Sequence, residues 1–178
     1  MQLRWTLSVG LPVTDEEATD ALGKLSGIVL QPDTGKIEGF FVQGGGLWPG
    51  QQLFLSSLDI LRWGTHVSVR SADVLGPSED RIRVQSLLAQ ARPILGQPIM
   101  TENGRVLGRC ADVQFDTEHF DVQWLFPRRW LRWGVALPVS QIIEVRKDAV
   151  IVRNTAAPEK ESKTEDTLPL LPRLPEAA

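Results

Sequence analysis

Few residues in this sequence are of the types that carry acid–base or nucleophilic chemistry. The chain has two histidines, His66 and His119, and one cysteine, Cys110. Catalytic groups must come within hydrogen-bonding reach of one another. The two histidines lie in different halves of the sequence, at positions that do not correspond in the repeat described below. We interpret both as strand or turn residues, and Cys110 as a buried small residue. Since zinc, nucleophile-elbow and dinucleotide motifs are also absent from the sequence, we expect no enzyme activity and no cofactor.

Four carboxylates fall within ten residues and could suggest a metal loop: Asp112, Asp116, Glu118 and Asp121. On a strand, Asp112 and Asp116 would share one face, while Glu118 would lie in the following turn. An EF-hand instead needs ligands at positions 1, 3 and 5 and a glycine at position 6. We therefore expect solvated hairpin carboxylates and no metal site.

The segment between Phe126 and Gly134 is the most distinctive candidate binding site. It interleaves three arginines with two tryptophans, namely Arg128, Arg129, Trp130, Arg132 and Trp133. Arg and Trp are enriched at protein-binding hot spots, and a basic aromatic loop also suits an anionic membrane surface or RNA with stacked bases. In the alternative interpretation, the tryptophans cap the fold and the arginines stay solvated. If the loop binds a partner, we expect Trp48 and Trp63 to contribute.

The elements that must position these residues are strands, most clearly in residues 94–121. Two apolar runs flank Asn103-Gly104 there, which predicts a β-hairpin with a type I′ turn. The same pattern occurs earlier, in residues 9–30. Gly10 and Gly23 are 13 positions apart in the first copy, and Gly96 and Gly108 are 12 apart in the second. The sequence therefore predicts a tandem pair of related units.

The later part of the repeat can be aligned in two ways. Leu-Arg-Trp-Gly occurs at both 61–64 and 131–134, but this alignment compares 41 positions after Gly23 with only 26 after Gly108. Aligning Ile60 with Ile142 compares 37 positions with 34. We adopt the second alignment and treat the repeated tetrapeptide as coincidence.

Both copies resemble the PRC-barrel domain, over residues 7–75 and 94–153. The shared pattern is a Gly-x-Pro/Val strand, a polar turn, Leu-Gly, a β-rich run and a late strand pair around Ile60 or Ile142. This small β-barrel occurs in the cytoplasmic part of the photosynthetic reaction-centre H subunit and in the 30S ribosome-maturation factor. The resemblance implies a mainly β fold of two small barrels in tandem, each docking on a larger assembly.

We predict four segments along the chain. A first barrel spans residues 1–76, with Trp5 and Leu7 closing one end, and a second barrel spans residues 94–153. Residues 77–93 form a helical linker that starts at Ser78 and lays Leu87 and Leu88 against the barrels; the alternative is a strand over residues 81–84. Because units of 60 to 70 residues are marginal alone, we expect the barrels to pack on each other or on a partner.

The last predicted segment, residues 154–178, is a disordered, Pro-rich, acidic tail. Its Pro169-x-x-Pro172-Arg173 motif fits a polyproline II ligand, although Leu-Pro segments also dock on their own domain. The overall net charge of −3 argues against the strongly basic surface of a nucleic-acid-binding domain. No apolar run reaches membrane-spanning length and residues 1–6 lack the apolar core of a signal peptide, so we expect a cytoplasmic protein.

These features together favour a non-catalytic adaptor. Its second-half Arg/Trp loop and its tail would contact a protein partner, including one in a membrane-associated complex with peripheral membrane contact. The alternative is an RNA-associated role in ribosome maturation or RNA metabolism, although no counterpart of the maturation factor's N-terminal domain is present.

Overall fold

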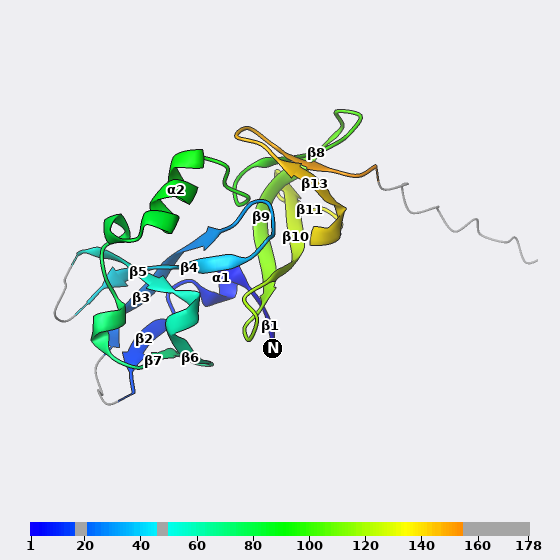
Figure 1. The fold of residues 1–178 in the computed structure, drawn as a ribbon. Coiled ribbons are helices and arrows are strands. Elements are labelled where there is room, and N and C mark those ends of the chain that lie inside the picture. Colours follow the sequence, from blue (N-terminus) through cyan, green and yellow to red (C-terminus); the bar gives the residue numbers. More distant parts are fainter. Residues whose placement is uncertain (17–20, 46–49, 155–178) are drawn as a thin grey trace, which may run out of the picture.

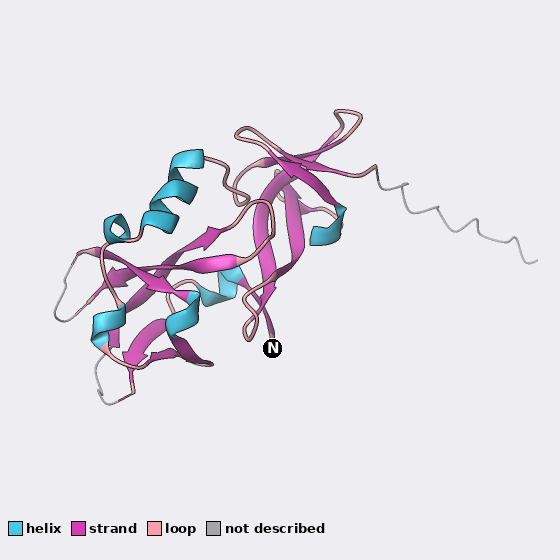
Figure 2. Ribbon diagram, in the orientation of Figure 1, coloured by secondary structure: helices cyan, strands magenta, loops and turns pink. Residues whose placement is uncertain are grey.

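The computed structural model describes residues 1–16, 21–45 and 50–154. These residues form a mainly β protein with two sheets and two short α-helices (Figures 1 and 2). The predicted β class is therefore confirmed. In each sheet the strand order runs from one edge strand to another, and the described strands form no closed barrel. Apart from Asn154, the predicted disordered tail lies outside the described residues.

The two sheets have the same strand order. The first runs β5 (Gln52–Ser56), β4 (Ile37–Gly44), β3 (Ala21–Leu30), β2 (Pro12–Asp15), β7 (Val67–Val69) and β6 (Ile60–Trp63). The second runs β11 (Arg132–Trp133), β10 (Val122–Arg129), β9 (Val106–Asp116), β8 (Pro98–Thr101), β14 (Val150–Val152) and β13 (Ile142–Val145). The short strand β12 (Leu137–Pro138) also pairs with β10. The predicted repetition of one strand pattern is thus present in the structure.

The two copies also match in hydrogen bonding. The N–H of Gly10 donates to the carbonyl oxygen of Leu25, and that of Gly96 donates to Cys110, both at 2.8 Å. Both glycines have a positive φ, of 85° and 81°, a conformation that glycine adopts at little cost. These paired contacts confirm the predicted match between the two glycine positions.

The later part of the repeat follows the alignment through Ile60 and Ile142. Each residue starts a strand directly after a 3₁₀ turn, η1 (Ser57–Asp59) or η4 (Val139–Gln141). The repeated tetrapeptide instead falls mainly on β6 in one half and β11 in the other, which occupy different places in their sheets. The shared Leu-Arg-Trp-Gly is therefore a coincidence, as predicted.

The two halves meet where their central hairpins turn. The N–H of Ile37 donates to Phe120 at 2.7 Å, and the N–H of Val122 donates to Gly35 at 3.0 Å. Ile37 pairs with Leu30 and Val122 pairs with Phe115 in the same way, so the two bonds join equivalent positions. This reciprocity is that of a two-fold, isologous contact within one chain.

One hydrophobic core extends across both halves. Its buried residues include Val13, Phe40 and Val67 from the first half and Phe115, Leu125 and Val150 from the second. At the junction, the ring centroids of Phe40 and Phe115 are 6.2 Å apart, and those of Trp63 and Phe115 are 5.5 Å apart. The expected packing of the two units on each other is therefore found.

The N-terminal lead-in crosses from the first half to the second. Strand β1 (Gln2–Arg4) lies beside β9 (Figure 1) and pairs with it, Leu3 being opposite Phe115. It continues into α1 (Trp5–Ser8), where Trp5 is buried and stacks on Phe40, with the two ring centroids 5.8 Å apart. Leu7, predicted to help close the first barrel, is 70% exposed. That assignment was wrong, because the short helix directs only one of the two side chains into the core.

The predicted linker helix is present as α2 (Ile82–Gln90), after the 3₁₀ turns η2 (Ala72–Val74) and η3 (Ser78–Asp80). Its N-cap residue is Arg81 and not the predicted Ser78, because residues 78–80 form their own turn. Val84 and Leu87 pack on the first sheet, while Leu88 is 44% exposed. Leu87 therefore makes the expected contact with the first sheet, whereas Leu88 is not buried against it.

The turn at Asn103-Gly104 differs in type from the prediction. Gly104 has φ 78°, but Asn103 is not among the described residues with a positive φ, so the turn is not type I′. Gly104 donates its N–H to the carbonyl oxygen of Thr101, and Arg105 donates to the Thr101 hydroxyl. The threonine side chain stabilises a longer loop with a single left-handed residue.

Candidate functional site

The Arg/Trp segment folds as a protruding β-hairpin rather than an irregular loop. Arg128 pairs with Trp133 and Arg129 with Arg132 across β10 and β11. Trp130 and Leu131 are left as a two-residue turn at the tip. The hairpin thus brings five of the six predicted site residues together, and Trp48, the sixth, lies outside the described residues.

The tip of this hairpin is apolar and exposed. Trp130 is 92% exposed and Leu131 is 86% exposed. Trp130 also has φ 56°, a region in which bulky residues are uncommon. A tryptophan in this conformation and with this exposure does not cap the fold. The capping interpretation is therefore wrong for Trp130, while the solvated arginines that it assumed are indeed exposed.

The base of the hairpin is fixed by Arg4 from β1. The guanidinium carbon of Arg4 lies 4.2 Å from the ring centroid of Phe126 and 4.8 Å from that of Trp133. Arg128 lies 5.4 Å from the same Trp133 ring, which is half exposed. Cation–π contacts of this kind hold an aromatic ring in place while leaving part of its surface accessible.

Arg4 is itself held by Asp112, which is fully buried. Nε of Arg4 lies 2.7 Å from Oδ2 of Asp112, and Thr6 donates to the same carboxylate from its N–H and its hydroxyl. The N–H of Val113 adds a further bond at 2.9 Å. The expectation of a solvated carboxylate was wrong for Asp112, because β1 and α1 cover it and supply its donors.

Cys110 is a buried thiol, as predicted, and is 0% exposed. Burial, and then the nearby charge of Asp112, raise the pKa of the thiol to about 12. A thiol is nucleophilic only as its thiolate. The position therefore serves packing beneath the hairpin rather than chemistry.

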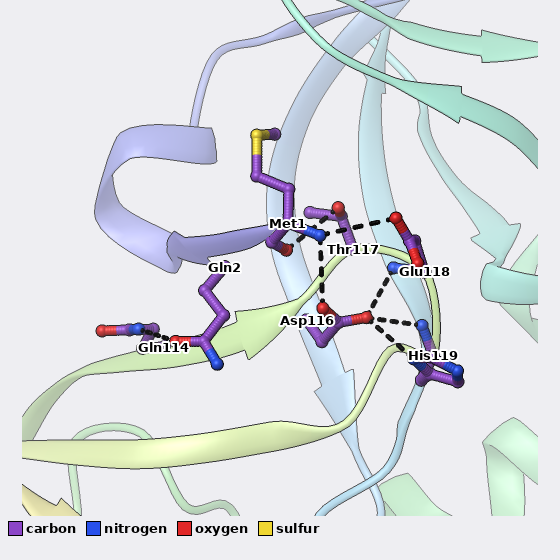
Figure 3. Close-up of polar contacts among 7 residues, drawn as sticks. All are labelled: Met1, Gln2, Gln114, Asp116, Thr117, Glu118 and His119. Atoms are coloured by element: carbon purple, nitrogen blue, oxygen red, sulfur yellow. Dashed lines mark hydrogen bonds and ion pairs between the residues drawn. The ribbon is translucent and has the colours of Figure 1, made fainter.

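The turn between β9 and β10 collects Asp116, Glu118 and His119 (Figure 3). One ligand-type atom from each of these side chains lies within 4.8 Å of the others. Asp116 Oδ1 accepts hydrogen bonds from the N–H groups of His119 and Glu118, and Oδ2 accepts one from the amino group of Met1 at 3.3 Å. The His119 N–H bond is the largest cause that holds the pKa of Asp116 well below its usual range. Asp116 thus stabilises this turn through backbone hydrogen bonds and forms an ion pair with the amino group of Met1.

The side chains of the other predicted polar residues are not part of this cluster. Asp121 forms a backbone bridge with Lys36 at the junction of the two halves. His66 lies between β6 and β7, beside Thr65, far in the sequence from His119 in the turn between β9 and β10. Trp63 packs among core aromatic rings and does not join the hairpin.

Residues 89–157 match the family model of the PRC-barrel domain. This part of the chain is a PRC-barrel domain. The match contains the whole second sheet apart from β1, and it includes the exposed hairpin of β10 and β11. A search of curated proteins found no significant match. Among the described residues, the helices are too short or too polar to cross a membrane.

Sequence reasoning missed the two residues that support the hairpin of this PRC-barrel domain. Arg4 was part of an apparently simple lead-in, and Asp112 belonged to a group of similar carboxylates. Their contact joins positions 108 apart, and no spacing in the sequence indicates it. The alternation of Cys110, Asp112 and Gln114 is a strand signal, but it does not reveal that β1 pairs with this strand and brings Arg4 to Asp112.

Proposed function

We propose that this protein is a cytoplasmic, non-catalytic adaptor in which the hairpin of residues 126–134 docks on a protein partner. The first half, which repeats the strand order of the PRC-barrel domain, would be a second unit of the same type. The observation that carries the proposal is Trp130, a large aromatic residue that is 92% exposed at a φ of 56°. The fold itself gains little from a tryptophan at this position.

The chemistry of the hairpin suits a protein surface. Trp130 and Leu131 would enter an apolar pocket, and Arg129 and Arg132 at the base of the turn would contact acidic groups on the pocket rim. Central aromatic anchors with charged neighbours are the arrangement found at binding hot spots. Because Arg4 and Asp112 already order Trp133, the protein loses less conformational entropy on binding.

An RNA-associated role is the second candidate, and the pairing of β9 with β10 favours it. Arg128 lies directly opposite Arg109 in that pair, so cationic side chains line both strands near the hairpin. A basic strip with exposed aromatic rings can bind phosphates and stack bases. Binding of this kind weakens steeply as salt rises.

Affinity capture from native lysate tests both candidates. The intact protein is compared with Trp130→Ser/Leu131→Ser and with Leu58→Ser, a control in which a residue 92% exposed in the first half is changed. We expect a defined protein to be retained by the intact protein and the control and lost by the tip variant. Equal retention by all three would reject the hairpin as the docking site. Capture of RNA that disappears in high salt would favour the second candidate.

A further inference from the structure

The lead-in strand β1 fills an edge in the second half whose counterpart in the first half is not paired with any of the described strands. On β9, residues 114–116 pair with β1. In the repeat, Leu30 of β3 corresponds to Phe115 of β9, because Leu30 pairs with Ile37 as Phe115 pairs with Val122. The corresponding edge is therefore residues 29–31. No described strand pairs with this edge of β3 beyond the part that β2 covers.

A groove lies along this open edge. It has a volume of about 400 Å³ and is lined by the edge residues Ile28 to Leu30, by the end of α2 and by the segment that follows it. The lining is mostly aliphatic, including Ile28, Leu30, Leu87, Leu88 and Leu95, with Lys147 among its polar groups. The match of Gly10 with Gly96 makes residues 88–90 the counterpart of β1, but they form the last turn of α2 and, within the described part of the chain, do not pair with this edge.

The residue that follows the groove-lining Leu30 carries a buried acceptor. Oε1 of Gln31 is shielded from solvent and has no hydrogen-bond partner among the described residues. Gln31 occupies the position of Asp116, whose carboxylate binds the amino group of Met1 beside β1. Burying an acceptor without a donor is costly, so a further segment that brings a donor to this end of β3 would be stabilising.

We propose that residues 167–171 of the same chain, Thr-Leu-Pro-Leu-Leu, occupy this groove as a short edge strand. In an extended conformation, the N–H groups of Leu168 and Leu170 point to one side and Pro169 lies on the other. Proline lacks an N–H and is tolerated where that side of an edge strand faces solvent. Pro172 would lie on the same side as Leu168 and Leu170 and so face β3 without an N–H to donate. The pairing would therefore end after about four residues.

Charge and chain length fit this occupant. Glu165 and Asp166 precede the apolar segment, and Lys147 lines the groove. Asn154 follows Lys147 by seven residues and so lies at most about 25 Å from it. The 13 residues from Asn154 to Thr167 can span about 43 Å. The tail can therefore reach the groove of its own molecule, and this site is independent of the hairpin proposed for the partner.

Disulfide trapping in the full-length chain tests the docking. Leu88→Cys, at the groove, is combined with Leu170→Cys and oxidised with glutathione disulfide. Ile82→Cys with Leu170→Cys is the control, because Ile82 is 87% exposed at the other end of the same helix. The native Cys110 is buried and does not interfere. We expect an intramolecular disulfide to form at least tenfold faster for the groove pair. Equal rates, or only disulfide-linked dimers, would overturn the proposal.

Hydrogen exchange provides a measurement that needs no new cysteine. Leu168→Asp/Leu170→Asp should raise the amide exchange rate of residues 28–31 about tenfold. Leu174→Asp, outside the proposed strand, should leave it unchanged. If the double variant exchanges at the same rate as the intact protein, the tail does not pair with β3.

Discussion

Arg4 and Asp112 form an ion pair of 2.7 Å between the lead-in strand and the second sheet. Asp112 is fully buried, while Arg4 is one-third exposed and lies against Phe126 and Trp133. The pair thus joins the N-terminus of the chain to the base of the exposed hairpin. Changes at Arg4 should therefore affect both the stability of the fold and the order of the hairpin.

Replacing Arg4 by methionine should destabilise the protein by about 3 kcal/mol, because it leaves the buried carboxylate of Asp112 without its cation. Arg146→Met is the control, since Arg146 and Glu144 form a 2.8 Å pair in which both side chains are more than half exposed. Its loss should cost less than about 1 kcal/mol. Urea unfolding at neutral pH measures both, and equal losses would mean that Asp112 is solvated.

Replacing Trp130 by glycine should make the protein more stable than replacing it by alanine, by about 1 kcal/mol. Both changes remove the exposed ring, but only glycine adopts a φ of 56° without strain. Thermal and urea unfolding of the two variants give the difference. If alanine is equally stable, Trp130 does not have a strained backbone. Both variants should lose the docking partner.

Replacing Gly39 by alanine should destabilise the first sheet by about 2–3 kcal/mol. A Cβ at this position of β4 would collide with the carbonyl oxygen of Leu55 and the ring of Phe54. Gly64→Ala is the control, since nothing lies within 4 Å of its added Cβ, and it should change stability by less than about 0.5 kcal/mol. A small loss at Gly39 would indicate that β4 and β5 can separate easily.

The charge of Asp116 should contribute stability that depends on pH. Its pKa is lowered in the folded protein, so the contribution is present above the unfolded-state pKa of about 4 and is lost as pH falls toward the folded value. Asp116→Asn keeps an acceptor but removes the charge. We expect the intact protein to be more stable at pH 7, and the difference to shrink between about pH 4 and pH 2. A difference that does not change with pH would exclude this linkage.

The presence of two related β units could be predicted from local signals, because glycines and alternating apolar residues act within a few positions. The type of the Asn103-Gly104 turn could not, since only Gly104 takes a positive φ and the loop is closed by a hydrogen bond from Arg105 to the Thr101 hydroxyl, which the dipeptide does not indicate. The candidate hairpin was located by composition alone. Its exposed tip depends on a two-residue turn at Trp130, a residue that carries no turn signal. The burial of Asp112 depends on β1, which is contributed from the other end of the chain.

The crossing of β1 has a consequence for the connectivity of the molecule. The segment ahead of the first half covers the second sheet, and α2, which leads into the second half, covers the first sheet. This is the arrangement of a domain-swapped pair in which both partners belong to one polypeptide. A cut between residues 76 and 77 would yield two fragments, each carrying a segment that the other needs. The protein is thus a natural starting point for fragment complementation, in which the two pieces recover their fold only by reassociating.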